Sequence, residues 1–346
     1  MRIALDVMGG DDAPSQNIAG LRLALADFPH IERFLVVGDE ARIKADIGDL
    51  SDDPRIEIVH ASQVVLMDEP SSTAVRKKRD SSIAVCSRLL KEGRADAIVS
   101  AGHTGASVAS TVITNRMLPG IDRPGIASVF PSPNGFFVLL DIGANVDCKP
   151  RNLAHYAILG EAYSRLVLGV DNPRVGMLSI GGEDGKGNEL TRNSSKLLAR
   201  MPVNFIGNVE GRDLFEGSVD VVVCDGFVGN VVLKCCEGMA KAMSGMLKEN
   251  LRKTPIRRAG ALLSKRAFGE LKELIDHEEY GGAPLLGING ICIIAHGSSS
   301  PKAIRNAIRV ASQMIRHEFN TYIKDTIATI EWEPANGADS STQKEV

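Results

Sequence analysis

An apolar run that ends in a glycine-containing turn with a polar residue occurs six times along the chain. The turns occupy residues 6–12, 100–105, 141–145, 179–184, 224–230 and 295–299. A helical pattern follows most of them, as in a sheet of parallel strands connected by helices. Because the loops at the carboxyl ends of such strands sit together and form the ligand site, we expect an enzyme with these turns as its active-site loops.

Continuous runs of Val, Ile and Leu indicate strands that are covered on both faces. The predicted strands are 3–7, 33–37, 56–60, 97–100, 126–130, 136–140, 175–179, 203–206, 219–224 and 288–294. The predicted helices are 18–27, 82–92, 105–116, 153–167, 189–200, 230–251 and 302–319, with a further helical segment at 259–274. This alternation predicts an α/β fold, a three-layer Rossmann-like sandwich with a mostly parallel sheet. We expect residues 1–335 to form a single catalytic domain and the polar residues 336–346 to form a disordered tail.

Composition and the absence of certain motifs narrow the classes of function that we expect for this chain. The net charge of −3 and the aromatic content of 4% give no reason to expect a nucleic-acid partner. The six cysteines have no C-x-x-C spacing, and the seven histidines form no H-E-x-x-H motif, so we expect no metal site. The N-terminus starts with a strand pattern, and no apolar run is long enough to span a bilayer. We therefore expect a soluble, cytoplasmic protein whose membrane contact is at most peripheral.

The segment at about 230–280 breaks the α/β pattern and predicts a protruding helical hairpin. Seven basic residues and one acidic residue, Glu249, lie between positions 248 and 266. One interpretation is a solvated hairpin with an apolar dimer face. We favour a second, in which a basic and partly apolar surface docks an acidic partner or an anionic membrane. The expected docking residues are Arg252, Lys253, Arg257, Arg258, Leu262 and Leu263.

The turn at 100–105 is the strongest candidate site. Familiar motifs are absent, including G-x-G-x-x-G, a complete P-loop and a nucleophile elbow. In this turn His103 stands directly before a predicted helix, and Thr104 and Gly105 open it. Free backbone amides at a helix start suit a phosphate or an oxyanion. A capping role for His103 is the structural alternative, and we favour function.

The remaining candidates lie on neighbouring turns. Asn145 and Asn230 each follow an Asp and a Gly, and ligand contact is as plausible there as helix capping. Asp11 and Asp12 are better explained as shaping their own turn than as metal ligands. The other predicted substrate-binding residues are Lys78, Lys186, Lys234, Asp6, Gly9 and Gly10.

Several of these motifs, taken in order, resemble those of the phosphate acyltransferase (PlsX) family. The matching segments are 6–11 (DVMGGD), 74–82 (AVRKKRDSS), 100–106 (SAGHTGA), 141–145 (DIGAN) and 225–230 (DGFVGN). The resemblance covers the chain to about residue 330.

The resemblance implies a bacterial enzyme that moves a long acyl chain from acyl carrier protein to inorganic phosphate. The acyl phosphate would feed phospholipid (phosphatidic acid) synthesis through a membrane glycerol-3-phosphate acyltransferase. It also implies a fold similar to phosphotransacetylases and isopropylmalate dehydrogenases, a homodimer with packed hairpins, and no metal or organic cofactor. The hairpin tip would contact the inner face of the membrane, so the cytoplasmic enzyme would be peripherally associated with it.

A mechanism follows in which phosphate attacks the thioester directly. Loop amides would hold phosphate, and His103, Asn145 and Asn230 would be the catalytic residues. No nucleophilic Ser or Cys is evident, so we predict no acyl-enzyme. Three alternatives stay open from the sequence: a phosphotransacetylase-like enzyme that uses an acyl-CoA, a dehydrogenase of the related fold, and a non-catalytic membrane-bound scaffold.

Overall fold

The computed structural model describes residues 1–66, 68–70, 75–275 and 277–332, so the predicted tail at 336–346 lies outside the described residues. Its strands form one 11-stranded sheet in the order β3-β2-β1-β4-β11-β10-β5-β6-β9-β7-β8. The strands are β1 (Arg2–Asp6), β2 (Arg33–Gly38), β3 (Ile56–His60), β4 (Ala97–Ser100), β5 (Gly125–Ser132), β6 (Gly135–Leu140), β7 (Arg174–Leu178), β8 (Asn204–Val209), β9 (Val221–Val223), β10 (Ala283–Leu286) and β11 (Cys292–Ile294).

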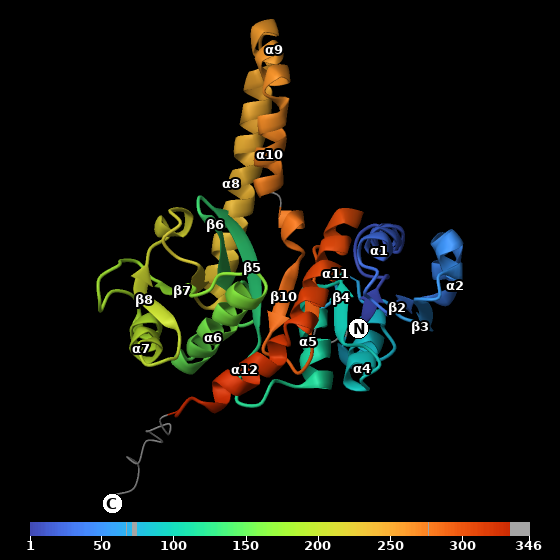
Figure 1. The fold of residues 1–346 in the computed structure, drawn as a ribbon, viewed down its shortest axis with the longest axis horizontal. Helices are drawn as coiled ribbons and strands as arrows, with labels where there is room; N and C mark the ends of the chain where they lie inside the picture. The colour runs from blue at the N-terminus through green and yellow to red at the C-terminus, as the bar shows by residue number, and fades with distance from the viewer. Residues whose placement is uncertain (67, 71–74, 276, 333–346) are drawn as a thin grey trace, which may run out of the picture.

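Helices cover both faces of this sheet (Figure 1). The α-helices are α1 (Ser15–Asp27), α2 (Glu40–Ile47), α4 (Ser82–Lys91), α5 (Thr104–Asn115), α6 (Pro150–Leu166), α7 (Glu189–Leu198), α8 (Gly226–Arg252), α9 (Pro255–Leu263), α10 (Lys265–Ile275), α11 (Pro301–Arg316) and α12 (Phe319–Ala328). Short 3-10 helices are η1 (Gly48–Asp52), η2 (Asp213–Phe215) and η3 (His277–Tyr280).

Two apolar layers confirm the predicted sandwich. Because side chains alternate along a strand, Ile3 and Leu5 of β1 face one layer and Ala4 faces the other. The first layer packs against α1, α6, α7, α11 and α12. The second layer packs against α4, α5 and α8. The sheet is therefore buried on both faces, which explains the continuous apolar runs of its strands.

The strands form two parallel groups that run in opposite directions. In one group, β1 pairs in parallel with β2 and β4, and β11 pairs in parallel with β4. In the other, β9 pairs in parallel with β6 and β7. Between them, β10 is antiparallel to β11 and β5, and β5 is antiparallel to β6. Three antiparallel pairings reverse the direction, so the expectation that all six glycine turns share one sheet edge is wrong.

The six turns instead divide into two clusters. The first cluster, at the carboxyl ends of β1, β4 and β11, contains the turns at 6–12, 100–105 and 295–299. The second cluster, at the carboxyl ends of β6, β7 and β9, contains the turns at 141–145, 179–184 and 224–230.

Four elements differ from the sequence-based prediction. The strand expected at 288–294 begins at Cys292, and β10 was not predicted, because it is four residues long and contains Pro284. Helix α2 has two buried residues, too few for a clear apolar stripe. The helix expected at 302–319 ends at Arg316, and an unpredicted helix, α12, begins at Phe319 after Glu318, which adopts a left-handed conformation with φ of 49°.

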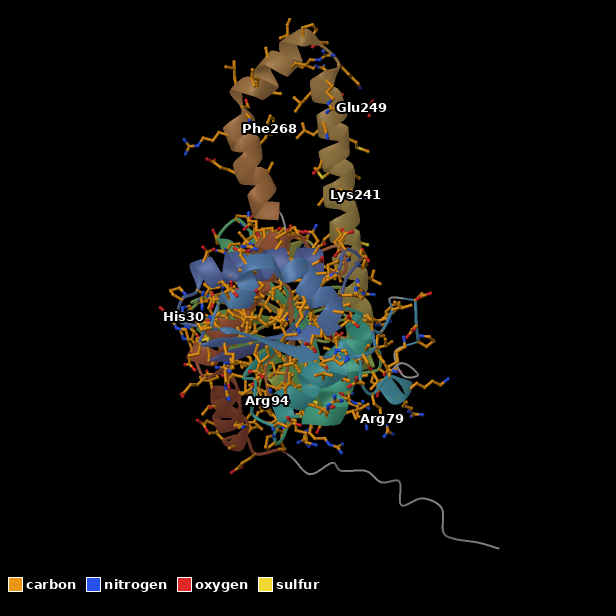
Figure 2. The ribbon with its side chains drawn as sticks, turned by 90° about the vertical axis from the view of Figure 1, so that its right-hand side faces the viewer. His30, Arg79, Arg94, Lys241, Glu249 and Phe268 are labelled. Atoms are coloured by element: carbon orange, nitrogen blue, oxygen red, sulfur yellow. The ribbon has the colours of Figure 1, made fainter. Side chains whose placement is uncertain are left out.

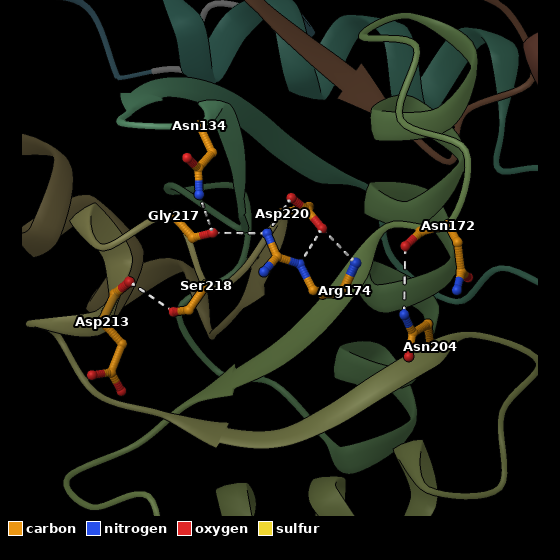
Figure 3. Close-up of polar contacts among 8 residues, drawn as sticks. All are labelled: Asn134, Asn172, Arg174, Asn204, Asp213, Gly217, Ser218 and Asp220. Atoms are coloured by element: carbon orange, nitrogen blue, oxygen red, sulfur yellow. Dashed lines mark hydrogen bonds and ion pairs between the residues drawn. The ribbon is translucent and has the colours of Figure 1, made fainter.

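The amino ends of β7 and β9 are joined by a polar clamp (Figure 3). The Arg174 guanidinium donates to the Asp220 carboxylate at 2.9 Å and to the Gly217 carbonyl at 2.9 Å. Asn134, in the turn between β5 and β6, donates to the same carbonyl at 3.1 Å. The clamp fixes the register of the strands whose opposite ends carry the second cluster.

Helices α8, α9 and α10 form the predicted hairpin, which rises away from the sheet (Figure 1). Helix α8 has 27 residues and is therefore about 40 Å long. Figure 2 shows Lys241 and Glu249 on one arm and Phe268 on the other. Large apolar side chains are exposed along the hairpin: Met239, Met243, Met246, Leu247, Ile256, Leu262 and Leu263. Among the described residues, no helix combines the length and apolar character needed to cross a bilayer.

Candidate active site

The first cluster is built around a close approach of two glycines. A Cβ at Gly9 would lie 2.5 Å from the backbone nitrogen of Gly102, so this crossing of the β1 and β4 turns requires glycine. At the base of the crossing, the Ser100 hydroxyl donates to the Asp6 carboxylate at 2.7 Å and accepts from the Gly102 amide at 3.1 Å. The two turns are thereby fixed to each other.

Asp6 is a buried scaffold carboxylate. Burial raises its pKa, while hydrogen bonds from the hydroxyls of Ser82 and Ser100 and from the amides of Met8 and Gly9 lower it. These four donors occupy the carboxylate oxygens. Asp6 therefore shapes the site from behind, and its expected role in substrate binding is indirect.

His103 caps helix α5 through its ring. The imidazole Nδ1 accepts a hydrogen bond from the amide of Ala106 at 3.2 Å. In the neutral ring the proton must then sit on Nε2, which becomes a donor. The amides of Thr104 and Gly105 belong to the first turn of the helix and have no partner within it. Capping and function are thus compatible, because the cap fixes the ring in a donating tautomer.

These groups surround a pocket at the N-terminus of α5, which we call the α5 pocket. Its polar lining consists of Asp6, Ser82, Gly102, His103 and Ser107, and its apolar lining includes Val64, Val65 and Ile83. Gly9 lines this pocket and also a second, neighbouring one, which contains Gly10, Asp12, Asn17 and Gly297. The structure therefore brings His103 together with Asp6 and Gly9, as the sequence predicted, and sets Gly10 in the adjoining pocket.

In the second cluster, Asp141 collects the amides of its own turn. Its carboxylate accepts from the backbone nitrogens of Gly143, Ala144 and Asn145 at 2.7–3.0 Å. The side-chain amide of Asn145 donates to the Pro124 carbonyl and to the Tyr156 hydroxyl. Both of its N–H groups are thus used inside the protein, which does not support the expected role of Asn145 as an oxyanion donor.

Asn230 differs from Asn145. Asn230 lies on the first turns of α8, and its side chain is exposed. A Cβ added to Gly143 would lie 3.9 Å from the Cβ of Asn230. Among the described contacts its side-chain amide has no hydrogen bond, so it is available to a ligand.

The three candidate lysines lie apart. Lys78 donates to the carbonyl of Val64, which lines the α5 pocket, and pairs with Glu69. Lys234 pairs with Glu237 at 2.8 Å on the exposed surface of α8. Lys186 is exposed on the turn that follows β7 and packs beside Gly181. Lys78 is therefore near the first cluster, and Lys186 belongs to the second.

Comparison with known proteins identifies the family. The model of a family described as "fatty acid synthesis protein" matches residues 1–322. A phosphate acyltransferase from Citrifermentans bemidjiense is 51% identical, with 90% of this chain and 89% of the relative aligned. One from Pelotomaculum thermopropionicum is 46% identical, with 97% and 98% aligned. The chain belongs to this phosphate acyltransferase family. The resemblance inferred from the motifs is confirmed.

Solved structures support the fold of this family member. A phosphotransacetylase from Streptococcus pyogenes aligns with a TM-score of 0.61 at 18% identity, covering 91% of this chain and 94% of that one. A branched-chain phosphotransacylase from Enterococcus faecalis aligns with a TM-score of 0.58 at 14% identity, covering 92% and 99%. The predicted likeness to the phosphotransacetylase fold is therefore confirmed.

The cysteines of this phosphate acyltransferase are poor nucleophiles where they are buried. Burial raises the pKa of Cys148 to about 11 and that of Cys292 to about 12, so both thiols stay protonated at neutral pH. Burial also raises the pKa of Cys224, in the second cluster, well above its usual value. Within the described part of the chain, no group of three or more His, Cys, Asp and Glu side chains is placed to hold a metal ion.

Sequence reasoning missed two kinds of functional candidate. The first is the pair of buried serines in the α5 pocket: Ser82 ends the 74–82 motif but was not selected, and no motif includes Ser107. The second is a set of exposed apolar side chains on the second cluster: Val146 is 61% exposed, Phe227 62% and Ile180 84%. Exposed apolar residues on three turns of an enzyme indicate an apolar substrate, and two of them, Val146 and Phe227, lie within three residues of Asn145 and Asn230 in the sequence.

Proposed function

We propose that this phosphate acyltransferase moves a fatty acyl group from the thioester of acyl carrier protein to inorganic phosphate. The observation that carries the proposal is the N-terminus of α5, where His103 lines a pocket beside a helix start that has two open backbone amides. A helix N-terminus with free amides is suited to a phosphate anion. Family membership supplies the reaction class, and the pocket supplies a place for the acceptor.

The chemistry needs no covalent intermediate. A phosphate oxygen attacks the thioester carbonyl carbon, the new C–O bond forms and the C–S bond breaks. The proton of hydrogen phosphate ends on the departing sulfur, giving acyl phosphate and free thiol. In this proposal the Nε2–H of His103 faces the developing negative charge, and the exposed amide of Asn230 is the oxyanion donor. Asn145 positions the turn beside it.

Both clusters border the same apolar layer, and they follow strands that run in opposite directions. Ala106, in the first turn of α5, and Ile142 and Cys224, in the second cluster, all contribute to the layer under α4, α5 and α8. We assign the exposed Val146, Ile180 and Phe227 to contact with the acyl chain. Lys186 adds positive charge to the same turns.

The hairpin is the part of the structure from which we propose contacts with a membrane and with a second copy of the chain. At its tip the side chains of Arg257 and Arg258 donate to the carbonyls of Asn250 and Arg252, which keeps the basic groups around one turn. Ile256, Leu262 and Leu263 are exposed on the same short helix. Basic charge beside exposed apolar groups suits an anionic membrane surface, where the acyl phosphate would be passed to a membrane glycerol-3-phosphate acyltransferase. The methionine row on α8 suits pairing with a second copy of the chain.

Two matched variants test the tip. Replacing Arg257 and Arg258 by Glu should abolish binding to anionic vesicles, because the local charge changes sign. The control replaces Lys241 and Lys248 by Glu, an equal change of charge on the shaft of α8. If both double variants lose binding equally, net charge and not the tip drives the contact. In the same variants, an unchanged rate with acyl carrier protein would exclude carrier docking at the tip.

The donor is tested by comparing two thioesters. The purified protein is given phosphate with either acyl carrier protein or coenzyme A carrying the same acyl chain, and free thiol is measured over time. We expect phosphate-dependent release that is faster with the carrier protein, since basic surface steers an acidic protein. Faster release from acyl-CoA would instead favour the phosphotransacetylase-like alternative.

A further inference from the structure

Ser107 presents a buried hydroxyl that lacks a partner. It lies in the second turn of α5, its side chain is 1% exposed, and its Oγ makes no hydrogen bond in the structure. The same residue lines the α5 pocket. A buried polar group without a partner is costly, and such groups in native proteins need an explanation. A ligand in the pocket would supply the missing bond.

The neighbours of Ser107 are donors. Helix α5 has 12 residues, and its first turn directs the amides of Thr104 and Gly105 out of the helix. His103 adds its Nε2–H, because Nδ1 is already an acceptor. The ring of His103 and the hydroxyl of Ser107 therefore line the pocket beside the positive end of a helix dipole, which favours a compact anion.

Ser82 supplies one acceptor to the same pocket. It is the first residue of α4, it is buried, and its hydroxyl donates to the Asp6 carboxylate. A hydroxyl has a single hydrogen, so the Ser82 oxygen can offer lone pairs only. Asp6 also lines the pocket, and its oxygens already accept from four donors. The pocket thus combines two side-chain donors, His103 and Ser107, with one fixed acceptor, Ser82.

This pattern fits hydrogen phosphate better than other tetrahedral anions. We propose that the α5 pocket binds the phosphate acceptor as HPO4²⁻, with Ser107 Oγ donating to a phosphate oxygen and Ser82 Oγ accepting from the P–OH group. The inference rests on the proposed function and adds to it the ligands of the acceptor and its selectivity. Sulfate has the same shape and charge but carries no proton at neutral pH, so it leaves the Ser82 oxygen facing an oxygen without a hydrogen between them.

The neighbouring pocket does not show this combination. Asn17 lines this pocket, but its side-chain amide already donates to the carbonyls of Val7 and Gly9. Asp12 adds a carboxylate to the pocket wall. Among the described residues, the unpartnered buried side-chain donors include none that line it. The α5 pocket is therefore the better anion site.

Replacing Ser107 by Ala tests the donor. We expect the KM for phosphate to rise by about tenfold, as for the loss of one hydrogen bond to a charged group, with the KM for the thioester unchanged. The matched control is Ser110→Ala on the same helix, whose hydroxyl is buried but paired with Ser87 at 3.1 Å. An equal phosphate KM in wild type and Ser107→Ala, with the control behaving alike, would overturn the role of Ser107.

A comparison of phosphate with sulfate tests the hydrogen-bond acceptor, Ser82 Oγ, without a variant. Inorganic phosphate should raise the melting temperature of the wild-type protein, and sulfate at equal ionic strength should not. In Ser82→Ala the difference between the two melting temperatures should shrink, because the oxygen that accepts the P–OH hydrogen is removed. Equal stabilisation of the wild type by both anions would overturn the proposed selectivity, even if the variants fail to fold.

The outcomes distinguish a failure of the proposed function from a failure of the proposed phosphate site. If phosphate releases no thiol from any acyl thioester with the wild-type protein, the proposed function fails. If phosphate-dependent release is normal but neither serine affects phosphate, the function stands and the assignment of the acceptor site is wrong.

Discussion

The ring of His103 and the amide of Ala106 are joined by a hydrogen bond of 3.2 Å, and this bond links the fold of the site to its chemistry. The amide of Ala106 also donates to the His103 carbonyl at 3.0 Å, and its bond to the ring sets the proton of the neutral imidazole on the outer nitrogen. A helix cap and an active-site donor are therefore the same side chain.

Replacement of His103 should separate these two roles. In His103→Asn the side chain can still cap the helix, because Asn is a favoured N-cap residue. We expect kcat to fall by about 10²-fold, as for loss of a positioned proton donor, with the melting temperature nearly unchanged. In His103→Ala both activity and stability should fall. Full activity in His103→Asn, measured by thiol release, would remove His103 from the chemistry.

Gly9 should tolerate no side chain. A methyl group there would overlap the backbone of Gly102, so we expect Gly9→Ala to lose about 1–3 kcal/mol of unfolding free energy and most activity. Gly211→Ala is the control, because a Cβ at Gly211 meets nothing within 4 Å. Chemical denaturation of both variants measures the difference. A Gly9→Ala variant as stable as the control would show that the two turns can separate.

The two asparagines should behave differently. Asn145→Ala removes two internal hydrogen bonds and leaves the carbonyl of Pro124 and the hydroxyl of Tyr156 with fewer partners, so it should destabilise the protein by about 1–3 kcal/mol. Asn230→Ala removes an exposed amide, so it should lower kcat with little change in stability. Denaturation curves and initial rates on the same samples decide between them. The reverse pattern would mean that Asn145 is the ligand-facing residue.

His155 should make the protein sensitive to acid. Burial lowers the pKa of this ring to about 4, so it stays neutral in the folded protein while the unfolded chain takes up a proton near pH 6.5. Stability is therefore lost as the pH falls from about 6.5 towards 4, by up to about 3 kcal/mol. His155→Phe, which keeps an aromatic ring against Trp332, should flatten this part of the stability profile. Replacement of the exposed His317 by Gln should not. An unchanged slope in His155→Phe would place the acid sensitivity elsewhere.

The glycine turns and the two apolar layers could be predicted from the sequence, because burial on both faces of a sheet gives continuous apolar strands. The grouping of the turns could not. The two antiparallel pairings of β10 cancel, so the net reversal comes from the β5–β6 pair, whose place in the sheet is set by long-range pairing. The hydrogen bonds of the Asn145 side-chain amide could not be predicted either. Its partners Pro124 and Tyr156 reach it only when β5 and α6 pack beside the turn.

The serines of the α5 pocket show the same limit. Ser107 stands in a helix among small residues, and its burial and lack of a partner follow from the packing of α5 in the first cluster. Residue types and spacing predicted that an anion site lies at the start of this helix. Tertiary packing determines which side chains complete it.

Direct attack of phosphate on a thioester leaves no acyl group on the protein, which rapid quenching of a single turnover can establish. Protein, acyl carrier protein carrying an acyl chain, and phosphate are mixed, and the quenched sample is analysed by intact-protein mass spectrometry and for acyl phosphate. We predict that acyl phosphate forms as the thioester is consumed while the mass of this protein stays unchanged. A protein mass increased by one acyl group, or thioester loss at the same rate without phosphate, would rule out direct attack by phosphate.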